Sequence, residues 1–412
     1  MSPATPPTTE LEVARPASRG LFAEALSETW QRPGARLGIA WIGLIAFLGV
    51  FAPLMASSFP LLVRVDGQLD SPWLDHLTAT DLTLMGTALL CVVLWFVPWS
   101  AGRKVMAAGA AAVVLAGVGV LTLSPPTTVV YDAYRVAEAR GEVEVLLRTP
   151  IVYSPNDRLR DRDDRRVDSP WWSGEGEYNH WLGQDRRQQD MASRMIHASR
   201  IAVAIGFIAT GIAAVLGVLI GAPMGYFGKT IDLIGMRLVE IFEFIPQLYL
   251  LLIFSAFFPG DQPEILPGVE VHRIYLIMGI IGLTSWTSYA RFVRAEFLRL
   301  RNQDFVQAAR ACGLPLQSIL FRHILPNGLT PVIVSASFGV ASAILAEATL
   351  SFLGLGLIEE PSWGQLLNQA QQSGSFLWWI ALFPGLAIFL TVFAYNLIGE
   401  ALRDAIDPKT VR

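Results

Sequence analysis

The sequence predicts an all-α polytopic membrane protein with about eight transmembrane helices. Of its 412 residues, 53% are hydrophobic and 16% are charged, whereas soluble domains carry roughly 25% charged residues. The hydrophobic residues also gather in runs of about 20, the length of helix that crosses a hydrocarbon core of roughly 30 Å. Basic residues concentrate in alternate connectors between these runs, as expected of connectors that stay in the cytoplasm.

Eight hydrophobic runs are long enough to be predicted spans. They lie at about residues 37–56, 82–99, 105–123, 201–226, 238–258, 273–289, 329–350 and 376–398. The chain therefore divides into five parts: a cytoplasmic tail (1–36), three N-terminal spans (37–124), an external segment (125–198), a transmembrane core (199–400) and a second cytoplasmic tail (401–412). The N-terminus lacks a short apolar core near Met1, so we expect no cleavable signal peptide.

Charges in the connectors predict that both ends of the chain are cytoplasmic. The connector between the first two spans holds four aspartates and one arginine, whereas the next connector holds Arg103 and Lys104. The strongest basic cluster follows the sixth span, where six arginines between Arg291 and Arg322 face only Glu296 and Asp304. Short basic connectors remain inside, so the segment 291–327 is predicted to be a cytoplasmic loop.

The external segment has its own local patterns. Residues 157–168 mix five arginines with five aspartates, a pattern that is typical of a solvated, salt-bridged surface. Residues 141–153 (GEVEVLLRTPIVY) alternate enough to predict one or two short strands. Trp171, Trp172 and Trp181 suit a membrane interface.

The stretch FVQAARACGLPLQSILFRHILPN, residues 305–327, has the pattern of two short helices. We call it the 305–327 loop. Asn302 or Asp304 is predicted to cap the first helix, and Gly313 fits the left-handed position that ends it. Pro315 is placed to begin the second helix, and Pro326 to stop it.

The first of these helices has a face of small and apolar residues. Phe305, Ala308, Ala309 and Cys312 are spaced to share that face. Two short helices joined at a glycine, with small side chains that permit close approach, suit docking into a cleft on another protein. An ordinary helical connector is the alternative.

The 305–327 loop resembles the EAA loop of ABC-importer permeases, whose pattern is E-A-A, three residues, G, nine residues and I-x-L-P. The residues at these positions, which the resemblance assigns to ATPase coupling, are Gln307, Ala308, Ala309, Gly313, His323, Leu325 and Pro326. The spacing from glycine to proline is kept. Gln307 replaces the glutamate of the pattern, and His323 replaces its isoleucine.

Two further stretches resemble signatures of the dipeptide, oligopeptide and nickel branch of these permeases. The first precedes the fourth span, and its matching residues include Gly183, Asp185, Asp190, Arg194 and Arg200. Its aspartates and arginines are expected to form internal ion pairs.

The second stretch, AEATLSFLGLG, contains Glu347, Gly354 and Gly356. An ionisable residue in an apolar span is by default a functional candidate. Here Glu347 lies about 24 Å along a helix from Pro331, near the outer boundary. A carboxylate with satisfied hydrogen bonds is therefore favoured over a proton relay. The two glycines are expected to let the chain turn at the external mouth.

The resemblance implies the permease subunit of a binding-protein-dependent importer in a bacterial inner membrane. Its fold would be a six-helix-type core with an extra N-terminal helix pair, spans two and three, and a long periplasmic segment. The segment Pro150–Ser154 adds a weaker likeness to Yej-type oligopeptide importers. The implied partners are a second permease subunit, two ABC ATPase subunits and a periplasmic substrate-binding protein, with membrane lipid around the helices. No nucleic acid and no cofactor are implied. Peptides are the expected cargo, with nickel or another small solute as the alternative.

Other function classes are disfavoured by what the sequence lacks. Gly228-Lys229-Thr230 would end a phosphate-binding loop only if position 223 were glycine, and that residue is Pro223; the chain is thus not expected to hydrolyse ATP. An ion-driven secondary transporter predicts relays near the midplane and an inverted repeat. An enzyme or metal site requires a convergent polar set, whereas the five histidines are scattered and the two cysteines, Cys91 and Cys312, stand far apart.

Overall fold

The computed structural model describes residues 27–123, 126, 128–159, 167–170, 179–258, 260, 262–266, 269–357, 360–372 and 377–406. Most of the first predicted tail, the end of the second, Trp171, Trp172 and the middle of the Arg–Asp alternation lie outside these residues.

The described chain is mainly helical. The long helices are α2 (Pro33–Val50), α5 (Ala79–Phe96), α6 (Ala101–Thr122), α8 (Met191–Phe227), α9 (Lys229–Glu243), α10 (Gln247–Phe257), α11 (Arg273–Leu300), α15 (Thr330–Phe352), α16 (Trp363–Gln372) and α17 (Trp378–Ile406). The short ones are α3 (Ala52–Met55), α4 (Pro72–Asp75), α7 (Ala133–Ala139), α12 (Asp304–Ala311), α13 (Leu316–Ser318), the π-helix η2 (Ile319–Ile324) and α14 (Leu325–Gly328).

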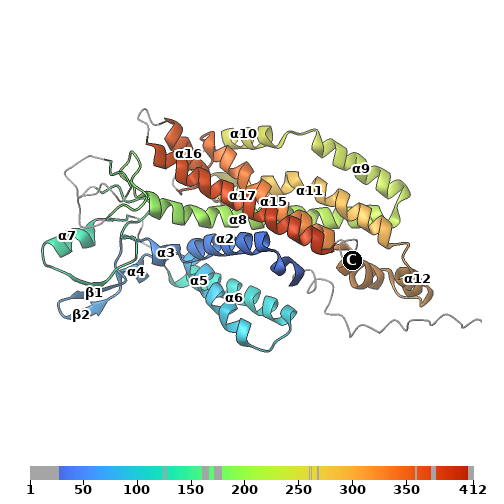
Figure 1. Cartoon of the computed structure of the whole chain (residues 1–412), viewed down its shortest axis with the longest axis horizontal. Coiled ribbons are helices and arrows are strands. Elements are labelled where there is room, and N and C mark those ends of the chain that lie inside the picture. Colours follow the sequence, from blue (N-terminus) through green and yellow to red (C-terminus); the bar gives the residue numbers. More distant parts are fainter. Residues whose placement is uncertain are drawn as a thin grey trace, which may run out of the picture.

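Helix α8 forms the axis of the bundle. It runs along the length of the molecule (Figure 1) and packs most extensively against α11, then against α15 and α2. Helix α17 packs against α15, α2 and α16. The short strands and α7 lie at one end of α8, and α12 lies at the other end (Figure 1). We call these the strand end and the loop end.

The spans agree with a polytopic helical membrane protein. Among the described residues, six helices are long and apolar enough to cross a membrane, and α9 with α10 makes a seventh candidate that bends by 63°. The bend falls at Pro246, which has no backbone N–H to donate. Helix α11 covers the predicted sixth span but is outside this set; it carries several hydroxyl residues and a basic C-terminal part.

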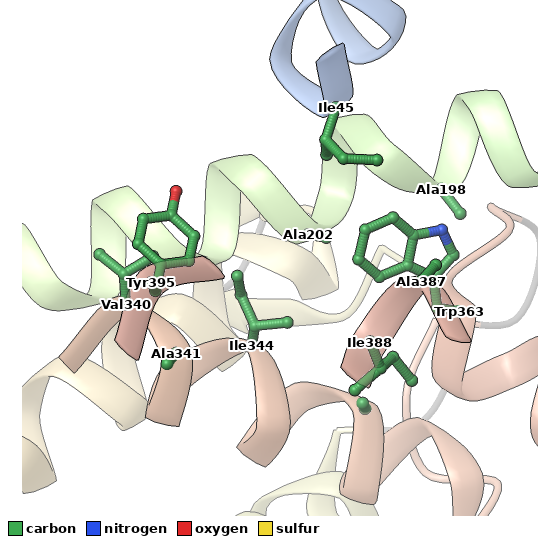
Figure 2. Packing of buried hydrophobic residues seen from close by; sticks show 11 residues of the cluster. Ile45, Ala198, Ala202, Val340, Ala341, Ile344, Trp363, Ala387, Ile388 and Tyr395 are labelled. Carbon is green, nitrogen blue, oxygen red and sulfur yellow. The ribbon is translucent and has the colours of Figure 1, made fainter. Parts of the chain in front are cut away.

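One core cluster joins five helices. Figure 2 shows Ile45 of α2, Ala198 of α8, Ile344 of α15, Trp363 of α16 and Tyr395 of α17 around one packed region. All five side chains are buried. Lipid tails are as apolar as these side chains, so close packing rather than removal from water stabilises the cluster where it lies in the membrane.

Helices α8 and α11 approach closely because α8 presents three glycines four residues apart. A Cβ on Gly221 would lie 2.5 Å from the Ala290 carbonyl oxygen, and one on Gly225 would lie 2.5 Å from the Arg294 carbonyl oxygen. A Cβ on Gly217 would clash with Tyr289. Small residues at this spacing bring backbones together in membrane helices. The stripe therefore explains why this helix pair has the most extensive contact.

The extra helix pair, α5 and α6, forms a hairpin beside the bundle. These helices pack on each other, and α5 touches α2. Asp81 joins the hairpin to α8, because its carboxylate accepts hydrogen bonds from Thr78 in a capping box and from Arg200 at 2.6 Å. Most apolar side chains of α6 are exposed.

Two small sheets lie in the connectors. Strand β1 (Leu62–Val65) pairs antiparallel with β2 (Gln68–Asp70) and β3 (Glu144–Leu147). The predicted strand in residues 141–153 is thus confirmed as β3, and the sheet ties the first connector to the external segment. The second sheet, β4 (Glu264–Leu266) and β5 (Val269–Glu270), was not predicted.

Enlarging Gly221 should separate α8 from α11. We expect Gly221→Leu to lower the free energy of unfolding by about 1–3 kcal/mol, the usual cost of overpacking. Thermal unfolding of the protein in detergent measures this. Gly211→Leu is the matched control on the same helix, because a Cβ there meets nothing within 4 Å. Equal transition temperatures for the two variants would contradict the role of the stripe.

Candidate functional site

The 305–327 loop begins with α12, whose N-cap differs from the prediction. The cap residue is Gln303, and its side chain makes no capping hydrogen bond. Asn302 Nδ2 donates instead to the Leu298 carbonyl oxygen at 3.5 Å. Asp304 lies in the first turn, where a carboxylate favours the helix dipole. The predicted cap by Asn302 or Asp304 is therefore wrong, since both lie one residue from the capping position.

Gly313 ends α12 as predicted. Its φ of +70° is left-handed, a conformation that glycine adopts without steric cost. The Gly313 N–H donates to the Arg310 carbonyl oxygen at 2.9 Å, and the Leu314 N–H donates to that of Ala309 at 3.2 Å. These two bonds form a Schellman motif, which fixes the direction of the chain after α12.

The predicted small-residue face of α12 is divided between two directions. Val306 and Ala309 are buried against α11, η2 and α15, in a cluster that includes Phe297 and Ile324. Phe305, Ala308 and Cys312 are exposed, as is Gln307. Ala309 therefore faces the bundle rather than sharing the outward face of Ala308. The backbone of α12 can then pack closely on one side and present a free apolar strip on the other.

The second helix of the loop is less regular than predicted. Pro315 does precede it, as the N-cap of α13. The helix then widens into η2, and Pro326 lies within the first turn of α14. Pro326 therefore does not stop the helix. Its ring cannot fit against a normal preceding turn, and a π-helical turn, which has wider i→i+5 bonding, lies directly before it.

The two remaining loop residues of the resemblance face different surroundings. His323 is half-buried, and its Nδ1 lies 3.0 Å from the Ser318 carbonyl oxygen. Leu325 packs against the cluster around Phe297. Further apolar side chains at Leu314, Leu316 and Phe321 are exposed. The loop thus combines a buried inner side with an outward apolar surface.

Arginines fix the loop end to neighbouring helices. Arg294 pairs with Asp232, and Arg291 pairs with Glu243, both on α9. Arg301 donates to the Tyr226 carbonyl oxygen at 3.1 Å, and the Arg310 guanidinium lies 5.2 Å from the centroid of the same tyrosine ring. The pairing of Arg294 with Asp232 was not predicted from the sequence.

The first signature stretch is a buried polar network at the N-terminus of α8. Asp185 pairs with Arg194, and both side chains are nearly inaccessible to solvent. Asp190 caps α8 by accepting from the Ser193 N–H at 2.7 Å. Gly183 packs beside Trp379, whose indole N–H donates to the Gln184 carbonyl oxygen at 2.9 Å. Together with Arg200, these residues fasten α8 to its neighbours.

Glu347 is a buried carboxylate with a local partner. It is 3% exposed and accepts a hydrogen bond from Ser351 Oγ at 2.6 Å. After α15 ends, the Gly354 N–H donates to the Ser351 carbonyl oxygen at 3.0 Å. Gly356 approaches Ser351 so closely that a side chain there would clash. These contacts favour a structural carboxylate over a proton relay.

A cavity that the sequence analysis missed lies beside α8. Its volume is about 420 Å³. Its lining comes from α8, α11, α15 and the start of α10, and consists of Ala209, Thr210, Ala213, Gln247, Ile281, Thr284, Ser285, Thr287, Ser288, Tyr289, Phe292, Ser335, Phe338, Gly339, Ser342 and Ala343. The sequence signal was the run Thr284–Ser288, in which four of five residues carry hydroxyls within a predicted span.

The cavity has a polar atom without a partner and several hydroxyls. Gln247 Nε2 is buried and makes no hydrogen bond within the described residues, whereas Thr210 lies beside the Tyr289 hydroxyl. Tyr289 reaches the Ser335 carbonyl oxygen at 3.4 Å. A buried donor or acceptor without a partner is costly, so these groups favour a polar guest or water in the cavity.

Comparison with known proteins identifies the protein family. Residues 217–412 match the family described as binding-protein-dependent transport system inner membrane component. The dipeptide transport system permease protein DppC of Alkalihalophilus pseudofirmus is 35% identical over 231 residues, which are 56% of this chain and 72% of the relative. This chain belongs to that family of inner-membrane transport components.

Two further relatives are also named as transport permease proteins. The oligopeptide transport system permease protein OppC of Haemophilus influenzae is 37% identical over 56% of this chain and 70% of its own length. The inner membrane ABC transporter permease protein YejE of Escherichia coli is 37% identical over 56% of this chain and 64% of its own. A solved structure of the MetNI methionine ABC transporter has 18% identity and a TM-score of 0.40, covering 52% of this chain and 97% of that one.

The predictions of a permease of binding-protein-dependent import and of a polytopic helical fold are confirmed. The 305–327 loop, Glu347, Gly354 and Gly356 lie inside the matched residues, whereas Gly183, Asp185, Asp190, Arg194 and Arg200 precede them. The roles of all these residues stay predictions.

Water should reach the hydroxyl-lined cavity. In a background with Cys91 and Cys312 replaced by serine, we expect Ser342→Cys to react with a water-soluble maleimide, because thiolates form only where water is present. Leu345→Cys is the matched control, since Leu345 is exposed on the apolar side of the same helix. Mass spectrometry of the labelled protein measures both rates. Similar slow labelling at both positions would contradict a hydrated cavity.

Proposed function

We propose that this chain is the permease subunit of an ATP-driven importer that carries short peptides across the bacterial inner membrane. The observation that carries the proposal is the 305–327 loop, which is packed tightly against the bundle on one side and exposes apolar side chains on the other. The names of the relatives support the cargo, because they refer to dipeptide, oligopeptide and peptide transport.

Each end of the molecule is assigned a different partner. The loop end docks on an ATPase subunit, so it faces the cytoplasm together with both chain termini. The strand end faces outward, where a substrate-binding protein delivers the cargo. A second permease subunit completes the pathway, and a second ATPase subunit docks on it.

Coupling works as a shift between two packings of the bundle. ATP closes the ATPase dimer, the dimer displaces α12, and the cluster around Phe297 transmits the displacement to α8, α11 and α15. To change the ratio of two conformations from 1:99 to 99:1, the ATPase dimer must supply about 5.5 kcal/mol. If the loop were loosely attached, it would move by itself and the helices of the bundle would stay in place. The contacts of Val306, Ala309 and Arg310 make the loop stiff enough to transmit the displacement.

The cavity chemistry favours peptides over a bare metal ion. Hydroxyls and the Gln247 amide can exchange hydrogen bonds with peptide groups of any sequence, which suits weak, transient contact. The residues that line the cavity include no aspartate, glutamate, histidine or cysteine. Nickel requires imidazole, thiolate or carboxylate ligands, so it is the less favoured cargo.

A bulky residue on the outward side of α12 should uncouple transport. We expect Ala308→Trp to weaken association with the ATPase subunits by at least about tenfold, which equals about 1.4 kcal/mol, because the indole blocks close approach. Co-purification of the complex and ATP-driven peptide uptake into vesicles measure the effect. Thermal unfolding of the permease should be unchanged, since Ala308 is exposed.

The control for this substitution is Ala139→Trp. Ala139 is also an exposed alanine on a short helix, but it lies at the strand end. If Ala308→Trp and Ala139→Trp support association and uptake equally well, the assignment of the loop as the coupling element is wrong.

A further inference from the structure

A second pocket lies at the strand end, far from the hydroxyl-lined cavity. Its volume is about 620 Å³, within the range of roughly 300–1,000 Å³ that is usual for small-molecule sites. Three segments meet there: the chain before α7, the turn around Asp157 and the turn that precedes α8. Its lining residues are Thr128, Val129, Val130, Tyr131, Asp132, Asn156, Asp157, Arg158, Arg187, Gln189 and Arg194.

Two of the charged lining residues are already neutralised. Asp157 accepts hydrogen bonds from Arg135 at 2.7 Å, from Ser58 Oγ at 2.7 Å and from the Leu159 N–H at 3.0 Å. Arg194 is paired with Asp185. Neither of these charges is available to a ligand at full strength.

The remaining charges leave the pocket with an excess of positive charge. Arg158 and Arg187 are exposed and form no ion pair in the described part of the chain, and Asp132 is the one unpaired carboxylate of the lining. Guanidinium groups bind carboxylates in a bidentate manner. Two arginines beside one aspartate therefore suit a ligand that carries a carboxylate and a smaller positive or donor group.

The deepest wall has polar atoms that lack partners. Gln189 is 3% exposed and Arg194 is 2% exposed. Gln189 Oε1 and Arg194 Nε make no hydrogen bond among the described residues. An unsatisfied buried polar atom costs roughly 1–3 kcal/mol. Gln189 Oε1 can accept a hydrogen bond from a peptide N–H, and Arg194 Nε can donate one to a peptide carbonyl oxygen.

Tyr131 keeps its proton at the pocket wall. Burial, and secondly the charge of Asp157, raises the pKa of its phenol above the ordinary value. The neutral hydroxyl can therefore donate a hydrogen bond at all physiological pH values.

We propose that this pocket binds a short peptide, with the C-terminal carboxylate on Arg158 and Arg187 and the ammonium group near Asp132. The inference rests on the proposed function and deepens it, because it gives the permease its own contact with cargo before the membrane pathway. Arg194 connects this site to α16, donating to Gln369 at 2.7 Å and to Gln365 at 3.3 Å.

Isothermal titration calorimetry of the full chain in lipid nanodiscs tests the pocket. The probes are tri-alanine, tri-alanine with an amidated C-terminus, and inorganic phosphate. We expect tri-alanine to bind, and Arg158→Ala/Arg187→Ala to weaken it at least tenfold. Amidation should weaken binding to a similar degree. Arg140→Ala is the matched control, because Arg140 is an exposed arginine of the same segment outside the pocket.

The outcomes separate this inference from the proposed function. Absence of tri-alanine binding, or equal binding by the amidated peptide, overturns the pocket assignment. Phosphate that competes as well as tri-alanine does would show a general anion site and also overturns it. ATP-driven uptake that persists in Arg158→Ala/Arg187→Ala while binding is lost would leave the importer assignment intact. Failure of the α12 test would remove the importer assignment and leave the binding result standing.

Discussion

The close contact between α8 and α11 is the constraint on which the rest of the structure depends. Gly217, Gly221 and Gly225 bring the two backbones together, and α11 then continues directly into the 305–327 loop. Helix α8 carries the polar network of Asp185 and Arg194 at its other end. In a membrane, where apolar side chains gain little from leaving lipid, small residues and close packing must hold such a pair together. The same contact therefore aligns the two ends of the molecule.

The loop end is held to the bundle by packing, which is what the proposed coupling role requires. Val306 and Ala309 are buried, Gly313 fixes the turn, and Arg310 lies over Tyr226. Each contact removes a way for α12 to move independently of α8 and α11. The cavity lies farther along these same helices, with Thr210 on the α8 wall and Ser288 on the α11 wall.

Much of the fold follows from periodicity and composition. The spans, the glycine that ends α12, and a strand in residues 141–153 were predicted because each depends on local chemistry. The direction of Ala309, the π-helical turn before Pro326 and the pairing of Arg294 with Asp232 were not, because each depends on which helices become neighbours. The two pockets were missed for the same reason, since their walls come from segments distant in sequence.

The buried Arg194 shows how the strand end is held in register with the bundle. An isolated buried charge is too costly to persist, so its guanidinium requires Asp185 and the amide oxygens of Gln365 and Gln369. Removal of one partner from such a pair typically costs about 3–5 kcal/mol. The hydrogen bonds from Arg194 to Gln365 and Gln369 hold α16 against the start of α8. Helix α16 in turn packs on α15 near Glu347, so a continuous set of helix contacts joins the pocket beside Arg194 to the helix that also lines the hydroxyl-rich cavity.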